Sequence, residues 1–590
     1  MYLGAFRVRS PLPEEKVKVS ETWVCTVSGA DGRVVAEKSG MVHPPTAIKE
    51  DREHDLRIWP TPAYGLFDNR RLHPCSQEEK LISAYRGDRI RIESVYLDEV
   101  ESGAFIIASL SGLRAHIDVA PFKKDFEGKT FSGQVSLFEL VPVGTVNGET
   151  VPDALMGLGN ARLTTLSAER ATKYWLRVDT HGAEPGCYTS KIVVEPLYRE
   201  SPPIELAVEL EVMPLRIHLP LKACTWDYVP NKWFPDRTDE VVEDMNRHGV
   251  NIFPRTGSIP KGRVDFAGQL AMDWTDLDVD LKRYEGRGTL LFQLTEPPIT
   301  FAVPPDAAKK REIQIRFLCE WRDHLEAHGR GYADYAFYPV DEPGLGYGGN
   351  NVQLLIDSAT LFREADPKFR VYTDPVPGLS QADYKRLEPL IDVWCPNMRL
   401  MSGALCGDPR VKGILGSGKT VWSYECVSQV RSLSPLCYNR ANAWRADFFG
   451  LSGIGFWTHS TTEKNEWFPG KGVNDEYVLV YPGPLPVFSV RWEAVRDGLE
   501  DVAAARLLQR LDKPEFKPPM YRDEASQELR MAHTDAMEAS DAAFIESRDF
   551  LRQGDRRIWH TWADVENYAR HRERIATLTK CTLGKGDTIP

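Results

Sequence analysis

Short apolar runs punctuate two long parts of the chain, with a different rhythm in each. Between Arg89 and Pro214, β-branched or aromatic runs are divided by turn residues, which predicts antiparallel β-structure. After Pro220 the rhythm changes to an apolar run, a loop and an amphipathic segment, repeated several times. That repeat is typical of parallel strands joined by helices.

The first part predicts a β-sandwich without a catalytic role. Its runs are RIRIESVYL, GAFIIASLSG, HIDVAPF, VSLFELVPV, YWLRVDT, GCYTSKIVVEP and IELAVELEVMP. The stretch WLRVDTHGAEPGCYTSKIVVEP carries a Pro-Gly turn between alternating runs and is interpreted as an immunoglobulin-type hairpin.

The second part predicts a (β/α)₈ barrel, because eight apolar runs alternate with helical patterns. The expected strands are ACTW (223–226), VNIFP (250–254), TLLFQL (289–294), YAFYPV (335–340), RVYTD (370–374), IDVWCP (391–396), TVWSYEC (420–426) and GIGFWTH (453–459). Pro339 lies inside the fourth run, where a central strand needs its N–H, so we expect a local irregularity there.

Two helical patterns support the barrel. Apolar residues recur every four positions from Ile313 to Leu325, and Thr238 to Gly249 has a threonine start and a glycine stop. Three further helices are expected after residue 486, near 490–511, 523–552 and 558–580. We expect them to pack on the barrel or on a second subunit of a homo-oligomer.

The chain is therefore predicted to be multidomain. Its expected parts are an N-terminal segment of unclear role (1–84), a β-sandwich (85–220), a catalytic barrel (221–486) and a C-terminal helical region (487–590). The barrel part is close to the roughly 250 residues typical of that fold.

Composition narrows the class of partner. A formal net charge of -12 and the lack of a dense Lys/Arg block argue against a nucleic acid. The chain has 15 Trp, 21 Tyr and 24 Phe, whose faces stack on sugar rings but also fill large cores. The ten Cys form no CxxC pair and no zinc-finger spacing, which favours free thiols in a reducing compartment.

The N-terminus and the hydropathy profile bear on location. The start MYLGAFRVRSPLPEEK lacks the apolar region of a signal peptide, and no run reaches the roughly 18 apolar residues of a membrane span. We expect either a cytoplasmic protein or one whose leader has been removed, in both cases without a membrane partner.

The most informative motif is Asp341-Glu342-Pro343-Gly344, which ends the fourth apolar run. Pro343 disfavours helical geometry for Glu342, so two adjacent carboxylates are expected at the mouth of a strand. Paired acids in one cleft are the residues of acid-assisted sugar chemistry. A bare Asp-Glu pair is more often a solvated turn, so the other strand ends decide its meaning.

Barrel enzymes place their active sites at the carboxyl ends of the strands, and polar or aromatic residues occupy those positions here. In strand order they are Trp226 with Asp227, Arg255, Gln293 with Glu296, Asp341 with Glu342, Asp374, Asn397, Tyr424 with Glu425, and Trp457 with His459. Each alone is equally well explained as a capping or solvated side chain. The complete ring favours a carbohydrate site.

Three other patterns are interpreted as structural. GILGSGKT (413–420) matches a phosphate loop, but a helix precedes it and a strand follows, the reverse of the order that such a loop needs. His324 and His328 lie one helical turn apart without an HExxH motif, so no metal site is expected. The acidic run RDGLED (496–501) is expected to cap and dock a helix.

The motifs YPVDEPG, WSYEC and GFWTH, followed by YPGPLPVFSVRWEAVRDGLEDVAAARLL, resemble glycoside hydrolase family 123 and its wider relatives. The resemblance covers roughly residues 85–590, and its sharpest parts are the DEPG tetrad and the R-x-E-x-x-R-D-G-x-E-D helix from Arg491 to Asp501. Members of that family are β-N-acetylgalactosaminidases in which an adjacent Asp and Glu run substrate-assisted, retaining hydrolysis.

The resemblance implies roles for individual residues and no cofactor. Asp341 would orient the 2-acetamido group and stabilise the oxazolinium ion, while Glu342 would protonate the leaving oxygen and later activate water. Tyr424 is expected to donate a hydrogen bond to the acetamido oxygen. The candidate ring platforms are Trp422, Trp457 and Trp467.

Two alternatives stay open. The same acids could act on a sugar without an N-acetyl group, by direct displacement or by inversion. A protein of another class, which binds carbohydrate on a retired enzyme scaffold, is the second; intact Asp341, Glu342 and Tyr424 count against it.

Overall fold

The computed structural model describes residues 21–28, 34–42, 56–84, 89–125, 127–145, 150–197, 202–225, 234, 236–255, 258–344, 351–401, 408–426, 430–460, 467, 477–511, 524–538 and 562–583. Contacts divide the chain into two compact units, residues 1–57 and 58–590. In the first unit, β1 (Glu21–Ser28) and β2 (Val34–Val42) form an antiparallel pair. The functional residues all belong to the second unit.

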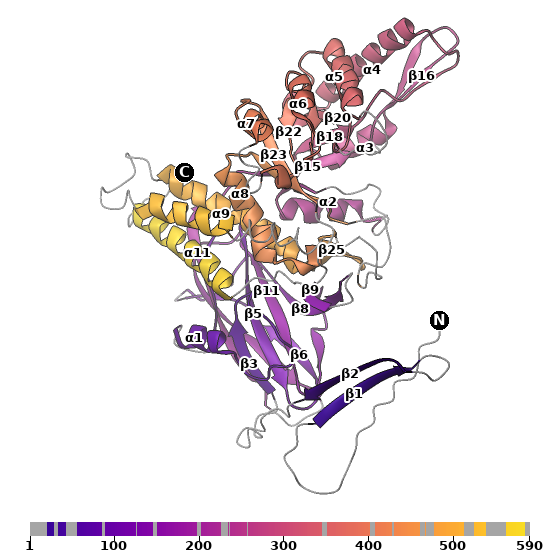
Figure 1. Ribbon diagram of the computed structural model, residues 1–590. Helices are drawn as coiled ribbons and strands as arrows, with labels where there is room; N and C mark the ends of the chain where they lie inside the picture. The colour runs from indigo at the N-terminus through magenta and orange to yellow at the C-terminus, as the bar shows by residue number, and fades with distance from the viewer. Residues whose placement is uncertain are drawn as a thin grey trace. The chain divides into compact units, whose positions relative to one another are not determined.

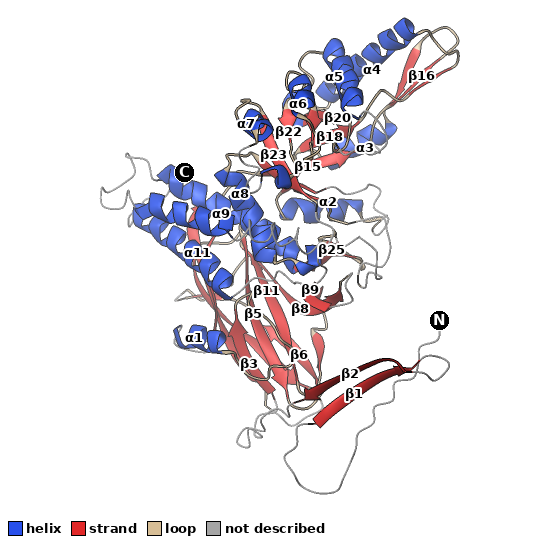
Figure 2. Ribbon diagram, viewed as in Figure 1, coloured by secondary structure: helices blue, strands red, loops and turns tan. Residues whose placement is uncertain are grey.

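Two mainly antiparallel sheets draw most of their strands from residues 56–216 (Figure 2). One has the order β25 (Val480–Tyr481), β26 (Val487–Ser489), β9 (Thr150–Gly157), β8 (Gln134–Gly144), β11 (Arg170–Asp179), β5 (Val100–Ser109), β3 (Leu56–Thr61). The other has the order β10 (Leu163–Leu166), β6 (Leu113–Val119), β12 (Gly186–Pro196), β13 (Ile204–Arg216), β4 (Arg89–Leu97), with β7 (Lys123–Lys124) beside β12. Strand β4 pairs in parallel with β13. Each of the seven runs predicted between Arg89 and Pro214 contributes to one of these strands.

The expected hairpin between β11 and β12 is wrong. Strand β11 pairs with β5 and β8, whereas β12 pairs with β13 and β6 in the other sheet. The Pro-Gly turn therefore carries the chain from one sheet to the other. Both strands form long hydrogen-bonded ladders with other partners. At the crossover, the Thr180 hydroxyl lies within hydrogen-bond distance of the carbonyls of Tyr96 and Glu99.

The predicted barrel is present as an eight-stranded parallel sheet. Its order is β20 (Tyr335–Tyr338), β18 (Thr289–Gln293), β15 (Val250–Arg255), β14 (Lys222–Thr225), β24 (Gly453–Phe456), β23 (Thr420–Glu425), β22 (Val393–Trp394), β21 (Tyr372–Thr373). A bridge from Phe337 to Val371 links the two edges of this sheet, so the barrel is nearly closed. Strand β20 ends just before Pro339, so the proline removes no hydrogen bond from the ladder.

Alternation along the barrel strands separates an inner from an outer face. One buried cluster takes residues from seven neighbouring strands and fills the interior: Cys224, Ile252, Leu291, Ala336, Tyr338, Tyr372, Val393, Cys395, Trp422 and Tyr424. The intervening residues, such as Phe253, Phe292 and Phe337, belong to a second cluster shared with the helices. Tyr338 and Tyr424 thus point into the barrel near its carboxyl end.

Helices alternate with the barrel strands, and Figure 1 shows α3 to α7 around the outside of the barrel. They are α2 (Thr238–Arg247), α3 (Thr275–Arg283), α4 (Ala307–Ala327), α5 (Asn351–Ala365), α6 (Gln381–Leu387), α7 (Pro409–Leu415) and α8 (Ala441–Phe448), with α1 (Ser76–Ala84) ahead of the barrel. A small sheet of β17 (Leu270–Asp273), β16 (Lys261–Val264) and β19 (Ile299–Phe301) is inserted near α3. The apolar face predicted on α4 is buried from Ile313 to Leu325.

The run GILGSGKT lies between α7 and β23. Helix α7 ends at Leu415 and β23 begins at Thr420, which is the predicted order. The Lys419 ammonium points back to the carbonyl of Glu388.

Helix α9 (Val490–Leu511) joins the barrel to the antiparallel sheets through buried charges. Arg491 pairs with Asp153 of β9, and Glu493 pairs with Arg177 of β11 and with His248 after α2. The acidic run RDGLED (496–501) was predicted to cap and dock a helix. It helps to dock α9, but it lies in the middle of this helix and does not cap it. Gly498 allows the close approach of the Arg440 carbonyl, which would lie 2.4 Å from an added Cβ.

Two further helices follow, at residues 524–538 and α11 (Trp562–Leu583). Figure 1 shows α11 beside α9, and Arg572 of α11 pairs with Glu99. Among the described residues, no helix is long and apolar enough to cross a membrane.

Candidate active site

The Asp341-Glu342-Pro343-Gly344 turn leaves β20 at the mouth of the barrel, as its position in the sequence predicts. Glu342 has φ +43°, a left-handed conformation that is rare for a residue with a side chain. Gly344 has φ +102°, and a Cβ there would lie 2.4 Å from the backbone nitrogen of Leu379. The turn is thus packed tightly on the loop after β21, which fixes the direction in which the two acids leave the strand.

A tyrosine hydroxyl connects Asp341 to a second, buried aspartate. The Tyr338 hydroxyl lies 2.6 Å from Oδ1 of Asp341 and also contacts Oδ2 of Asp374. Burial, followed by the nearby Asp341 carboxylate, raises the pKa of Asp374 well above its ordinary value. One hydroxyl proton cannot serve two carboxylates, so we assign a second proton to Asp374, which donates to the Tyr338 oxygen while Tyr338 donates to Asp341.

Glu342 is held from two sides. The Tyr424 hydroxyl donates to Oε1 of Glu342, and the Glu342 backbone N–H donates to Oδ1 of Asp374 at 3.1 Å. Burial is the largest cause that raises the pKa of Tyr424, so this phenol stays a donor. Tyr424 was expected to reach the acetamido oxygen, whereas in the structure its hydroxyl is on Glu342.

The two acids differ in exposure. Asp341 is exposed and Glu342 is half-buried, whereas Asp374 and Tyr338 are each 1% exposed. An incoming ligand can therefore reach both acids, and the Tyr338–Asp374 pair beneath them is closed to it.

Three other predicted residues lie around the same site. Asn397 forms a bridge with Tyr424 on the neighbouring strand and also contacts its side chain. Trp457 is partly buried against the barrel-lining cluster, and its backbone N–H donates to the carbonyl of Glu425. Trp422 is 2% exposed and packs against Tyr372 inside the barrel, so its ring is not open to a sugar.

Arg255 lies elsewhere because of strand alternation. Ile252 points into the barrel, so Arg255, three positions on, points out. Its guanidinium donates to Asp280 of α3 at 2.7 Å and to the Tyr284 hydroxyl at 2.9 Å. The structure does not bring this residue to the mouth of the barrel.

His459 and Trp467 also have partners away from the two acids. His459 is fully buried, with Nε2 3.1 Å from Oδ2 of Asp244 on α2. Trp467 stacks on Tyr481 and donates its indole N–H to the carbonyl of Pro482. Trp226 lies outside the described residues.

Tyr338 is the residue that the sequence prediction missed. It lies three positions before Asp341 in YPVDEPG, and the alternation of β20 places it on the inner face with Ala336. Reading that alternation back from the acids would have found it.

The sequence matches no protein-family model, and no curated protein matches it. Among solved structures, the fold is similar to that of a family 123 glycoside hydrolase from Clostridium perfringens, described for glycolipid glycan hydrolysis. The TM-score is 0.59 at 12% identity, over 89% of this chain and 98% of that chain. The expected resemblance to family 123 is therefore confirmed at the level of the fold.

Other similar structures are more distant glycoside hydrolases. Xylanase 10C of Cellvibrio japonicus has a TM-score of 0.33 at 12% identity, over 68% of this chain and 91% of that chain. A family 5 xyloglucanase of Bacteroides ovatus has a TM-score of 0.28 at 9% identity, over 70% of this chain and 99% of that chain. At these scores they bear on neither the substrate nor the site.

Proposed function

We propose that the chain is a glycoside hydrolase whose catalytic acids are Asp341 and Glu342. The observation that carries this proposal is the turn after β20, where two adjacent carboxyl groups are each fixed by a buried tyrosine hydroxyl. Such fixed carboxyl groups at the carboxyl end of a barrel supply general acid-base chemistry to a bound sugar. Similarity to the fold of a family 123 enzyme supports the same reaction class.

Asp341 is proposed to act as the anionic member of the pair. Asp374 donates its assigned proton to the Tyr338 oxygen, and the Tyr338 hydroxyl donates to Oδ1 of Asp341, which leaves Asp341 as a carboxylate with one oxygen for the substrate. In a 2-acetamido sugar this oxygen would accept the amide N–H, turn the acetamido oxygen toward the anomeric carbon and stabilise the resulting oxazolinium ion.

Glu342 is proposed as the general acid and base. Tyr424 donates to Oε1, so a proton on Glu342 belongs on Oε2, from which it would pass to the glycosidic oxygen of the substrate. After the leaving group departs, the same carboxylate would accept a proton from water. The hydrogen bond from the Glu342 backbone N–H to Asp374 would hold the backbone of Glu342 in place during both the acid step and the base step.

The substrate proposal is an exo-cleaved 2-acetamido sugar of the β-N-acetylgalactosaminide type. Trp457, half-buried beside the barrel mouth, is proposed as the ring platform, because Trp422 is buried and Trp467 stacks on Tyr481. A sugar without the acetamido group, or binding without turnover, are the alternatives, and the same assay separates them.

Chromogenic β-GalNAc, β-GlcNAc and neutral glycosides should be tested with the wild-type chain and with Glu342→Gln. Turnover confined to the acetamido sugars, together with inhibition by a thiazoline analogue far tighter than by N-acetylgalactosamine, supports the proposal. Cleavage of neutral glycosides without thiazoline inhibition would leave the acids in place and remove the acetamido role. Saturable sugar binding without any turnover would contradict an enzyme.

We also propose the predicted domain arrangement, with a β-sandwich at 85–220, the barrel at 221–486 and helices at 487–590. Support for a sandwich comes from β4 and β5, which belong to different sheets: an added Cβ on Gly103 would lie 2.5 Å from Ile90 and 3.3 Å from Ile92. The faces of the two sheets therefore touch at this point.

A further inference from the structure

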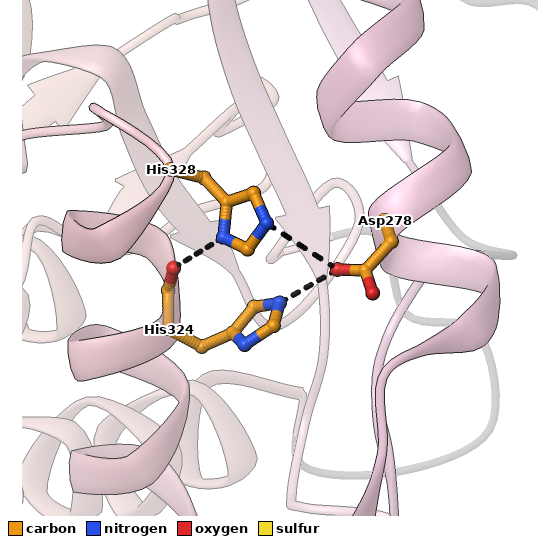
Figure 3. Close-up of side chains that lie close together, drawn as sticks. All are labelled: Asp278, His324 and His328. Carbon is orange, nitrogen blue, oxygen red and sulfur yellow. Dashed lines mark hydrogen bonds and ion pairs between the residues drawn. The ribbon is translucent and has the colours of Figure 1, made fainter.

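Three metal-ligating side chains gather on the outside of the barrel, between α3 and α4 (Figure 3). They are Asp278 of α3, His324 near the end of α4 and His328 just beyond it, called here the α3–α4 histidine cluster. Nε2 of His324 lies 2.6 Å from Oδ1 of Asp278, and Nε2 of His328 lies 3.9 Å from the same oxygen. One helical turn separates the two histidines, so both face α3.

A backbone contact determines which nitrogen of His328 faces Asp278. Nδ1 of His328 lies 2.8 Å from the carbonyl oxygen of His324, which can only accept, so Nδ1 carries a hydrogen. In the neutral ring, Nε2 then presents a lone pair to a carboxylate oxygen. Two electron-rich atoms face one another, and a cation between them removes the repulsion.

We propose that the α3–α4 histidine cluster binds a zinc ion. Its donor set of two imidazole nitrogens and one carboxylate oxygen is one that zinc accepts, with a further position left to water. The donor atoms lie within 4.8 Å of one another, and Asp278 is 48% exposed at its side chain, so it can move to the roughly 3.3 Å spacing that tetrahedral zinc requires.

The surroundings of the two histidines match those of metal ligands. The bond from Nδ1 of His328 to a backbone carbonyl is the kind of outer contact that orients a ligating imidazole. The ring of His324 stacks on Trp274 at 4.1 Å with an interplanar angle of 4°, which fixes its plane. When zinc binds, His324 moves its proton from Nε2 to Nδ1.

The location gives this site a structural role. The end of α4 leads into the start of β20, whereas Asp341 follows the end of that strand, so the cluster and the proposed active site lie at opposite ends of the barrel strands. A bound ion would join α3 to α4, which β18 and β19 separate in the sequence. We expect it to stabilise the barrel and to leave hydrolysis unchanged.

Calorimetry with zinc chloride and the full chain at pH 7.5, after chelator treatment, tests the proposal. We expect one zinc per chain with a Kd of about 10 µM or below, weakened at least tenfold or so by His328→Gln and by Asp278→Asn. Zinc at a hundred times its Kd should raise Tm of the wild-type chain by about 2 °C or more, and should not raise it in either variant.

The matched control is His181→Gln, at an exposed histidine 3.3 Å from Asp98 with a single imidazole. It should bind zinc as the wild-type chain does. Cobalt in place of zinc should give a spectrum without thiolate charge transfer, since the cluster holds no cysteine. The proposal would be overturned if the wild-type chain bound no zinc, or if all variants bound it equally. A proton, and not a metal ion, would then lie between His328 and Asp278.

Discussion

The hydroxyl of Tyr338 lies 2.6 Å from Oδ1 of Asp341 and reaches Asp374 on its other side. This single group connects an exposed acid to a buried one. Because burial raises the pKa of Asp374, the Tyr338 hydroxyl is assigned as a donor to Asp341, and the proposed mechanism depends on that bond.

Tyr338→Phe should lower kcat on the order of 100-fold with a smaller change in KM, because Asp341 loses the donor that orients it. Steady-state kinetics on an aryl glycoside would measure this. Tyr335→Phe is the matched control, since Tyr335 lies on the same strand and faces the outer cluster. Equal losses in the two variants would contradict a positioning role for Tyr338.

Asp374→Asn should retain activity within about threefold, because a neutral amide can accept from the Glu342 N–H and donate to Tyr338 as protonated Asp374 does. Asp374→Ala should lose activity on the order of 100-fold. If Asp374→Asn is as damaging as Asp374→Ala, Asp374 is an anion and the proton assignment fails.

The same substitution predicts a pH effect on folding. The pKa of Asp374 is raised in the folded state, so its protonated form contributes stability below its ordinary pKa near 4, and this is lost as the pH rises through the folded value. Urea unfolding from pH 4 to pH 8 should show the wild-type chain losing stability relative to Asp374→Asn. A constant difference would contradict the raised pKa.

Gly344→Ala should lower kcat, because its Cβ would collide with the Leu379 backbone and shift the turn that carries both acids. Gly268→Ala is the control: its φ is +78°, but nothing lies within 4 Å of the added carbon. Both variants should lose about 1 kcal/mol of stability from the left-handed backbone, and Gly344→Ala more. Kinetics and urea unfolding of the two variants separate the strain of the left-handed backbone from displacement of the turn that carries the acids. Unchanged kcat in Gly344→Ala would contradict a fixed turn.

Asp244→Asn should destabilise the chain by about 3 kcal/mol without changing kcat of the folded fraction. Burial alone would raise the pKa of Asp244, but His248 and His459 lower it well below its ordinary value. Its contribution is present above pH 4 and is lost as the pH falls, so the variant should show a weaker acid transition. The control is Asp239→Asn, at an exposed residue of the same helix, which should neither destabilise the chain nor weaken its acid transition. A fall in kcat of the folded Asp244→Asn variant would contradict this and would support a place for His459 in the substrate site.

Hydrophobic periodicity was enough to predict the barrel. All eight expected runs overlap a barrel strand, because buried parallel strands need continuous apolar segments. The apolar stripe of α4 is buried as expected. The pairing of β11 and β12 was not accessible in this way, since a turn between two runs does not say whether they share a sheet.

The site residues that a local pattern marks were predicted, and those that depend on distant partners were not. The two acids and Tyr424 lie together at the mouth of the barrel, as their places in the motif and at the strand ends predict. Arg255 was misplaced because the strand end was read without its inward or outward phase, and His459 because a buried ion-pair network has no local pattern. Tyr338 was missed since its role depends on Asp374, far away in the sequence.

The central claim is that Glu342 delivers the proton to the leaving oxygen. The most direct measurement is kcat of Glu342→Gln on two glycosides of one sugar, one with an activated aryl leaving group and one with an unactivated sugar leaving group. We expect several powers of ten lost on the unactivated substrate and a much smaller loss on the aryl glycoside, with Kd for the product little changed. Full activity of Glu342→Gln on the unactivated glycan would contradict the account.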